Sequence, residues 1–527
     1  MRSDVLIIGA GGAGLVAAIN AHESGAKVVV ITKEYPTRSQ TCMAQGGINA
    51  ALGNMGEDSV EAHVKNTLKS AHSIANEEAV RHLCQSAPDA ITWLDSIGVC
   101  FSRTKDAKIA QRTLGGASAP RACYAQDYTG LKILHTLYDR CLSLGIEILN
   151  EKFLLDYLVE DNFACGAVVL DIRTGEVQTY ESASVIIATG GYSGIYDKHS
   201  TNSSATTGDG LAAAIRAGAR VSDMEFVQFH PTALKSSSVL ISESARGAGG
   251  FLLNSKGERF VNELLPRDEV ARAIDTEMKK SEDIFLDIRH LGEEFINKEL
   301  PQERKLAKLY ENLDPVYDLI PVKPVAHYTM GGIEVDNKSS TIVKGLYAVG
   351  ECANHRVHGA NRLGGNSLLE LVVFGEQAGK NAALYSKSFD KKIDSSKQLK
   401  RDKDFLSKIK SFSNEIDFYK IREELGDMFY KNVGISRCKN TLEASLKKVE
   451  CLLSEIHLMG VSDKSKVYNT NLTEFLEFEN MLELSKLVLQ GAITRDESRG
   501  SHFREDFPQE NEKFKMHTIV DRNGVVS

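Results

Sequence analysis

Three short stretches of this chain carry side chains that can bind a carboxylate, although they lie far apart in the sequence. They are His230-Pro231-Thr232, His327-Tyr328 and residues 358–362, which run from a histidine to Arg362. An arginine fork and imidazole N–H groups can hold both ends of a small diacid. We therefore expect the fold to bring the three stretches together in one site.

A glycine-rich stretch near the N-terminus is typical of a dinucleotide-binding turn. Residues 5–8 are apolar and read as a buried strand, and Gly9-x-Gly11-x-x-Gly14 opens the helix that follows. The first glycine permits a tight turn, the second lets a pyrophosphate approach, and the third packs the helix on the strand. Alone the pattern could be a structural turn. In dinucleotide-binding domains an acidic residue that binds the ribose is expected at the end of the second strand. Lys33 occupies that position here, so this part of the pattern is not met.

Composition excludes several classes of protein. The chain has 527 residues, 25% of them charged, with a formal charge of −8, which gives no reason to expect nucleic acid as a partner. None of the nine cysteines is spaced as Cys-x-x-Cys, so we predict no metal or iron–sulfur centre in this chain. No apolar run reaches the roughly 20 residues that span a bilayer. Reduced thiols and the lack of a signal sequence predict a cytoplasmic protein.

The order of predicted elements indicates an α/β protein with a Rossmann-like domain. Residues 1–223 and 331–385 alternate between strands and helices and are assigned to the nucleotide-binding domain. Residues 224–330 have mixed short elements and are assigned to an inserted α+β domain. The polar residues 386–404 are predicted to be a linker, and residues 405–527 a helical C-terminal domain.

Longer motifs make a family recognisable. Residues 36–52 contain Ser39-Gln40-Thr41 and Gln45-Gly46-Gly47, and residues 358–369 read HGANRLGGNSLL. With these motifs the chain resembles the flavoprotein subunit of succinate dehydrogenase and fumarate reductase, over residues 3–385 and again over 495–508. The resemblance implies FAD and a capping function for the inserted domain. It implies flavin contacts at Gly9, Ala10, Gly11, Gly12, Ala13, Gly14, Ser39, Gln40, Thr41, Gly46, Gly47, Asp209, Glu351, Ser367 and Leu368.

Two of these predicted flavin contacts can also be explained as ordinary structural residues. Without the resemblance, Asp209 is explained nearly as well as a helix cap. Glu351 could be an ordinary acid at the start of a helix.

Gln40 departs from the family members that attach FAD covalently, because they have histidine at this position. An amide is a poor nucleophile and cannot form that link, so we expect dissociable FAD. In the family the covalent bond raises the flavin potential. Its loss favours fumarate reduction over succinate oxidation, which is our hypothesis for the direction of this reaction.

The resemblance also assigns the substrate site. It places dicarboxylate binding on His230, Ser242, His327 and Arg362, with Ser242 standing where the family usually has threonine. Arg267 matches the family's proton-donating arginine, and Glu243 and Arg246 match the relay that resupplies its proton. The expected reaction is hydride transfer from flavin N5 to one alkene carbon and proton transfer from Arg267 to the other. His358 is left out of the predicted set, since a single histidine is more often structural.

Two other functions remain open from the sequence. The chain also resembles L-aspartate oxidase, which binds FAD non-covalently and shares almost every motif. Leu114 argues against that activity, because aspartate oxidases typically have a glutamate there for the substrate ammonium. A non-catalytic FAD-binding assembly subunit is the second alternative, which the intact donor set disfavours.

The resemblance implies partner proteins, because this chain has no cluster or haem motif to pass electrons onward. It implies an iron–sulfur subunit and, behind it, a membrane anchor or a thiol-oxidising module. The chain would then lie in the cytoplasm or at the cytoplasmic face of the inner membrane. The sequence does not decide between quinone, thiol and soluble carrier as the electron partner, and it leaves the oligomeric state open.

Overall fold

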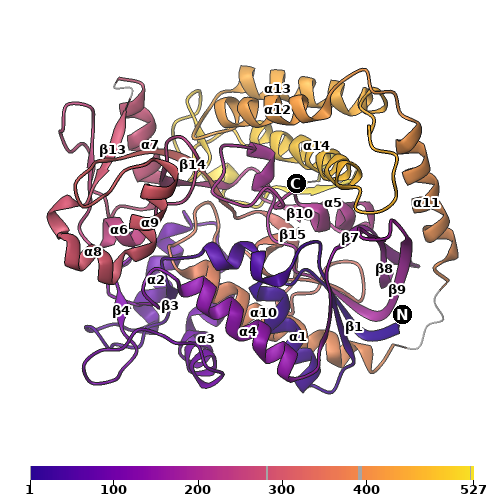
Figure 1. Ribbon diagram of the computed structural model, residues 1–527, viewed down its shortest axis with the longest axis horizontal. Coiled ribbons are helices and arrows are strands. Elements are labelled where there is room, and N and C mark those ends of the chain that lie inside the picture. Colours follow the sequence, from indigo (N-terminus) through magenta and orange to yellow (C-terminus); the bar gives the residue numbers. More distant parts are fainter. Residues whose placement is uncertain (1, 281–282, 390–393, 523, 527) are drawn as a thin grey trace.

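The structure, a computed structural model, describes residues 2–280, 283–389, 394–522 and 524–526 (Figure 1). A seven-stranded sheet has the strand order β6-β2-β1-β9-β8-β7, and β16 also pairs with β9. The strands are β1 (Arg2–Ile8), β2 (Val28–Ile31), β6 (Glu147–Leu149), β7 (Lys152–Glu160), β8 (Phe163–Asp171), β9 (Val177–Ile187) and β16 (Leu346–Ala348). β1 runs parallel to β2 and β9, so the turn at Gly9 opens at the carboxyl edge of parallel strands, where nucleotides bind.

Two helices from opposite ends of the nucleotide-binding domain pack closely against each other. α1 (Gly12–Glu23) follows the glycine turn, and α10 (Asn366–Ser386) lies beside it in Figure 1. The glycines of α10 make this approach close: a Cβ at Gly379 would lie 2.4 Å from the carbonyl oxygen of Ala17. α10 therefore packs against the first helix of the nucleotide-binding domain, to which residues 331–385 were assigned.

The inserted segment forms a second sheet with helices around it. Its strand order is β11-β14-β13-β12, all antiparallel. The elements are β11 (Val227–Leu234), α6 (Glu243–Gly247), β12 (Phe251–Leu253), α7 (Arg267–Met278), β13 (Ile284–Asp287), α8 (Glu293–Glu299), α9 (Pro301–Tyr310) and β14 (Ile320–Thr329). Buried side chains such as Ile241, Val270 and Leu286 give this segment a hydrophobic core of its own.

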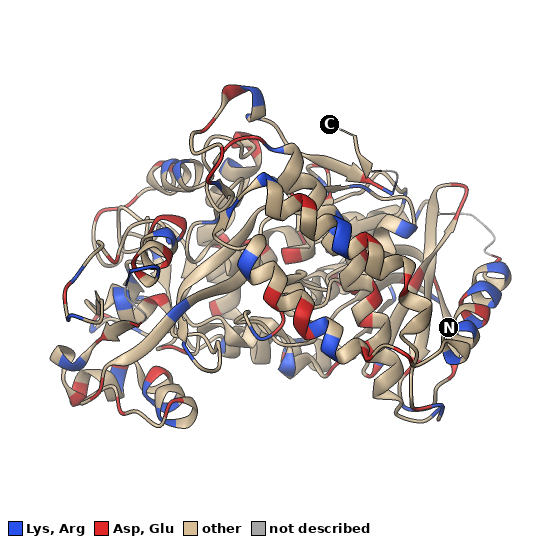
Figure 2. Ribbon diagram, turned by 90° about the horizontal axis from the view of Figure 1, so that it is seen from above, with Lys and Arg blue, Asp and Glu red and all other residues tan. Residues whose placement is uncertain are grey.

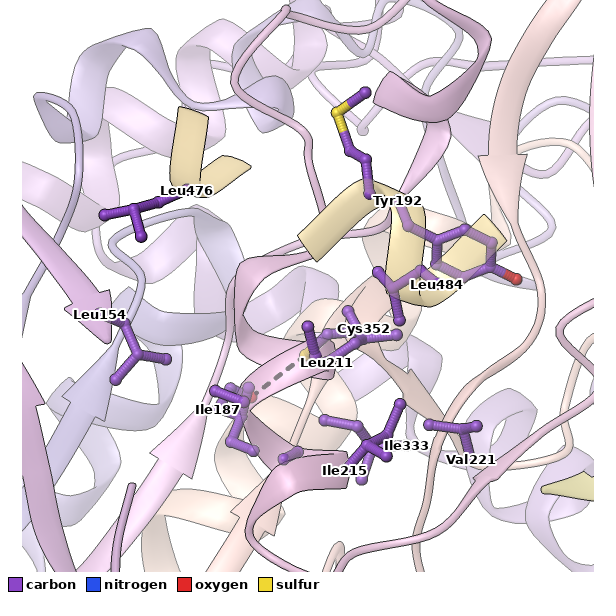
Figure 3. Close-up of a cluster of buried hydrophobic side chains, with 14 of the residues drawn as sticks. Leu154, Ile187, Tyr192, Leu211, Ile215, Val221, Ile333, Cys352, Leu476 and Leu484 are labelled. Carbon is purple, nitrogen blue, oxygen red and sulfur yellow. Dashed lines mark hydrogen bonds between the residues drawn. The ribbon is translucent and has the colours of Figure 1, made fainter. Parts of the chain in front are cut away.

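Four long helices follow and cover the first domain. They are α11 (Ser396–Ser411), α12 (Phe418–Asn432), α13 (Lys439–Ser454) and α14 (Thr470–Thr494). Figure 3 shows how Leu476 and Leu484 of α14 join a buried cluster with Leu211 of α5 (Asp209–Arg216) and Ile187 of β9. The predicted α/β class, with an inserted α+β segment and a helical C-terminal part, is confirmed. Among the residues described here, no helix is long and apolar enough to cross a membrane.

The C-terminal part differs from the sequence prediction in two ways. The predicted linker, residues 386–404, is shorter than expected, because α11 begins at Ser396; residues 390–393 lie outside the described part. α11 buries Leu406 and Ile409 while Lys and Arg cover its outer side, at the right-hand edge of Figure 2. The region is also not helical throughout, since β20 (Ile519–Asp521) pairs with β10 (Val221–Ser222).

Candidate active site

One cavity is lined by both sets of predicted residues. On one side lie the glycine turn from Gly9 to Ala13 and the loop around Ser39 to Gly47. On the other side lie His230, Ser242, Glu243, Arg267, His327 and Arg362. The three carboxylate-binding stretches thus converge, although they come from β11, β14 and the loop before α10. Gly14 and Arg246 are not among the lining residues.

The two predicted histidines stand on neighbouring antiparallel strands. The ring centroids of His230 and His327 are 4.9 Å apart, and Nδ1 of His327 lies 2.7 Å from Oγ1 of Thr201. Burial, and then the nearby Arg267 charge, lower the pKa of His327 well below its ordinary value. Burial, and then the charges of His327 and Arg267, have the same effect on the pKa of His230. Both imidazoles are therefore neutral and can act as hydrogen-bond partners for a carboxylate.

Arg267, Glu243 and Arg246 form a continuous buried group. Nε and Nη2 of Arg267 donate to Oε2 of Glu243 at 2.9 and 2.6 Å. Nη2 of Arg246 lies 3.9 Å from Oε1 of the same carboxylate. Burial raises the pKa of Glu243, but the charges of Arg267 and Arg246 outweigh it and lower that pKa below its usual range. Glu243 is therefore ionised, and the three side chains lie in the order of the predicted proton relay.

Gln228 connects the two cavity-facing arginines, and sequence reasoning missed it. Its Oε1 accepts from Nη1 of Arg267 at 3.1 Å and from Nη2 of Arg362 at 3.0 Å. Its Nε2 donates to Oδ1 of Asn361 at 2.7 Å. Gln228 precedes His230 by two positions on β11, so alternation along the strand places both on one face. The spacing alone does not distinguish Gln228 from other residues of β11, because its role depends on two arginines from distant segments.

Arg362 is a buried cation with hydrogen-bonding capacity left over. Its guanidinium lies 4.2 Å from the ring centroid of Tyr328, and its Nη1 donates to Oγ of Ser367 at 3.3 Å. Its Nε is buried and has no partner in the described structure. Burial, and then repulsion from Arg267, lower the pKa of Arg362 to about 10, so it remains charged at neutral pH. An anionic ligand would supply the missing partner.

His358, Tyr328 and Ser242 have contacts that shape the site. His358 does not line the cavity, and its Nε2 lies 2.9 Å from Oε2 of buried Glu370, which also accepts from the Tyr328 hydroxyl at 2.6 Å. These contacts hold Tyr328 beneath Arg362. Oγ of Ser242 accepts from the backbone of Ser244 at 3.1 Å and so caps α6, which begins with Glu243.

Comparison with known proteins decides the family. The FAD binding domain family matches residues 4–368, and the fumarate reductase flavoprotein C-terminal family matches residues 422–526. The succinate dehydrogenase flavoprotein subunit of Rickettsia bellii is 39% identical over 561 residues, covering 100% of this chain and 94% of the relative. The chain belongs to the flavoprotein subunits of succinate dehydrogenases and fumarate reductases. It is an FAD-dependent oxidoreductase.

Further relatives of this flavoprotein subunit cover nearly the whole chain. The flavoprotein subunit of 8-methylmenaquinol:fumarate reductase from Wolinella succinogenes is 40% identical, covering 99% of this chain and 89% of the relative. A solved quinol–fumarate reductase with menaquinol molecules superimposes with a TM-score of 0.96 at 35% identity, covering 100% and 97% of the two chains.

Unsatisfied polar atoms on the nucleotide side of the cavity fit a bound FAD. Oγ of Ser39, Oγ1 of Thr189 and both amide atoms of Gln45 are buried without a partner in the described structure, and all three residues line the cavity. A Cβ at Gly11 would meet nothing closer than 3.6 Å, whereas one at Gly14 would lie 2.0 Å from the carbonyl of Gly9. Gly11 thus leaves room for a ligand and Gly14 packs the helix. Thr189 and Gln45 were not among the predicted contacts.

Other predicted flavin residues have additional protein partners. Asp209 is the first residue of α5 and lies 2.7 Å from Nζ of Lys33, which also pairs with Glu477 of α14 at 2.7 Å. Lys33 therefore joins the end of β2 to the C-terminal helices. Glu351 accepts from the backbone of Thr329 at 2.9 Å, and burial raises its pKa to about 7.

The rest of the predicted flavin set, apart from Gly14, lies at the same cavity. Oε1 of Gln40 accepts from the backbone of Ser203 at 3.0 Å. Oγ1 of Thr41 accepts from the N–H of Gly12 at 3.0 Å, which ties the loop to the glycine turn. The other lining members are Ala10, Gly46, Gly47, Ser367 and Leu368.

Proposed function

We propose that this flavoprotein subunit interconverts fumarate and succinate, that it favours fumarate reduction, and that its FAD is bound non-covalently. The observation that supports the proposal is the convergence of Arg267, His327 and Arg362 on the cavity that also holds the glycine turn. The two arginines share one oxygen of Gln228, which fixes their relative positions.

The proposed chemistry assigns a task to each side chain around the cavity. Arg362 can pair with one carboxylate of the diacid through two N–H groups, and the neutral imidazoles of His230 and His327 and the loop at Ser242 hold the other. Bound FAD would supply the hydride for the alkene. Arg267 would give a proton to the second alkene carbon, and Glu243, 2.6 Å from its Nη2, would return one from the side of Arg246. Succinate oxidation would reverse these transfers.

The direction and the attachment of FAD rest on Gln40. Its side chain lines the cavity and ends in an amide, which cannot form a covalent bond to flavin. Without that bond the flavin potential is expected to be lower, which favours fumarate as the oxidant.

L-aspartate oxidase and a non-catalytic assembly subunit remain the alternatives, and no contact in the described structure favours either. Leu114 is buried, and its Cδ1 would lie 3.6 Å from a Cβ at Gly46. An apolar side chain there offers nothing to a substrate ammonium group. The relay of Arg267, Glu243 and Arg246 would serve no purpose in a scaffold.

Electron transfer requires partners, which we infer by analogy with the relatives. The Wolinella relative is named as part of a menaquinol-linked fumarate reductase. For this chain we propose an iron–sulfur subunit, with a membrane anchor or a thiol-oxidising module behind it. The chain would then be cytoplasmic, or peripheral at the cytoplasmic face of the inner membrane.

A single purified sample tests the function. Fumarate reduction by reduced viologen should be rapid, while aspartate-dependent oxygen uptake should be at background. The reverse result would assign the chain to aspartate oxidation. FAD binding without either activity would support the assembly role.

A further inference from the structure

Glu303 is a buried carboxyl group beside the substrate loop that the proposed reaction does not use. It lies on α9, and its side chain is 0% exposed. Its Oε1 accepts from the backbone N–H of Ser242 at 3.0 Å, and its Oε2 has no partner in the described structure. Glu303 thus touches the backbone of a cavity-lining residue directly next to Glu243.

Asp127 approaches the same helix end from the nucleotide-binding domain. It precedes α4 (Thr129–Ser143), and it too is 0% exposed. Its Oδ2 accepts from the backbone N–H of Gln302 at 2.6 Å and of Glu303 at 3.3 Å, while Oδ1 has no partner in the described structure. A carboxylate of one domain therefore holds the first turn of α9, which in turn holds the Ser242 loop.

Two acids so close together and so deeply buried cannot both ionise easily. Burial raises the pKa of Asp127 to about 6. Burial, and then the charge of Asp127, raise the pKa of Glu303 well above its ordinary value. Arg112, whose cation opposes both shifts, and Tyr128 lie around the pair, and Glu299 and Tyr124 lie near Arg112. Of the two acids, Glu303 therefore holds its proton to the higher pH.

We propose that Glu303 is a positioning residue for dicarboxylate binding: as a neutral acid it holds the Ser242 loop, and as a carboxylate it repels the diacid from that loop. The inference rests on the proposed function, because the repelled ligand is the diacid itself. Ionisation of Glu303 adds a negative charge 3.0 Å from the Ser242 nitrogen, in a site closed to solvent. Repulsion in such a site is strong, so binding should weaken while the transfers at Arg267 continue.

The test is the pH dependence of KM and kcat for fumarate, with reduced viologen as donor, for the FAD-loaded full chain from about pH 6 to pH 9, below the pKa of about 10 at which Arg362 loses its charge. For the wild-type chain we expect KM to rise by about tenfold as Glu303 ionises, with little change in kcat. Glu303→Gln keeps the size and the acceptor for Ser242 but cannot ionise, so it should abolish that rise. Glu294→Gln, at an exposed position on α8, is the matched control and should keep the wild-type profile.

Asp127→Asn gives a second test, because the direction in which it should shift the pH of the KM rise is known in advance. It keeps an oxygen for the N–H of Gln302 but removes the negative charge that raises the pKa of Glu303. The rise in KM should therefore move to lower pH, which a purely structural role would not produce. The same rise in Glu303→Gln as in the wild type, or an unmoved rise in Asp127→Asn, would overturn the inference. Absence of fumarate reduction by the wild type at neutral pH would instead reject the proposed function and this inference with it.

Discussion

The carboxylate of Glu243 lies 2.6 Å from Nη2 of Arg267, and its other oxygen accepts from the backbone N–H of Gly115 at 2.7 Å. A residue of the inserted segment is thereby bonded both to a proposed proton donor and to a loop of the nucleotide-binding domain. The carboxylate is fixed at both oxygens, so its position depends on the closed arrangement of the two parts.

Replacement of Glu243 by glutamine tests the proton relay. The amide keeps the shape but cannot accept and return a proton, so kcat for fumarate reduction should fall by about 10²- to 10⁴-fold. FAD content should stay at the wild-type level, because Glu243 is not among the predicted flavin contacts. Steady-state kinetics with reduced viologen and the flavin-to-protein absorbance ratio measure these effects. A kcat within a few-fold of wild type would exclude Glu243 from the relay.

Gln228→Leu should weaken both binding and turnover. It removes the oxygen shared by Arg267 and Arg362, and each hydrogen bond to a charged group contributes about 1.5–3 kcal/mol. We expect kcat/KM for fumarate to fall by about tenfold to several hundredfold. Gln178→Leu, at an exposed position on β9, is the control. Equal kinetics of the two variants would show that Gln228 does not position the arginines.

His72 should make stability depend on pH. Its Nδ1 lies 2.8 Å from Glu510 and its Nε2 lies 3.5 Å from Asp268, which follows Arg267. Burial lowers the pKa of His72, but the contacts with Asp268 and Glu510 outweigh burial and raise it above the ordinary value. The stabilisation is therefore fully present below the unfolded pKa, about 6.5, and is lost as pH rises through the higher folded pKa.

Thermal unfolding of wild type and His72→Gln at a series of pH values measures this effect. The wild type should unfold at the higher temperature in mildly acid solution, and the difference should shrink at alkaline pH. His135→Gln, at an exposed position on α4, is the control. A difference that grows with pH would contradict the assigned sign.

The attachment of FAD is tested by acid precipitation. With Gln40 in the loop, flavin absorbance should remain in the supernatant after the denatured protein is pelleted. Flavin that stays with the pellet would show a covalent bond at another residue and remove the argument for the direction of the reaction.

Much of the site could be predicted because its signals are local. The turn at Gly9 and the segment ending at Arg362 are continuous motifs, and each lies at an element boundary that the sequence pattern locates. Gln228 could not be singled out, because its role depends on two arginines from distant segments. Helix α11 was not predicted because its sequence is rich in charged residues. Only a few apolar positions, such as Leu406 and Ile409, are buried in the core. The pairing of β20 with β10 could not be predicted, because a three-residue strand has almost no pattern of its own.

The contact between α1 and α10 also has a consequence for how the chain is made. α1 is among the first segments to leave the ribosome, and α10 emerges only after more than half of the polypeptide has been synthesised. The glycine turn therefore cannot gain its full support during early translation, because contacts between such distant segments form late. We expect nascent chains stalled before residue 366 to retain no flavin and to depend on chaperones for solubility.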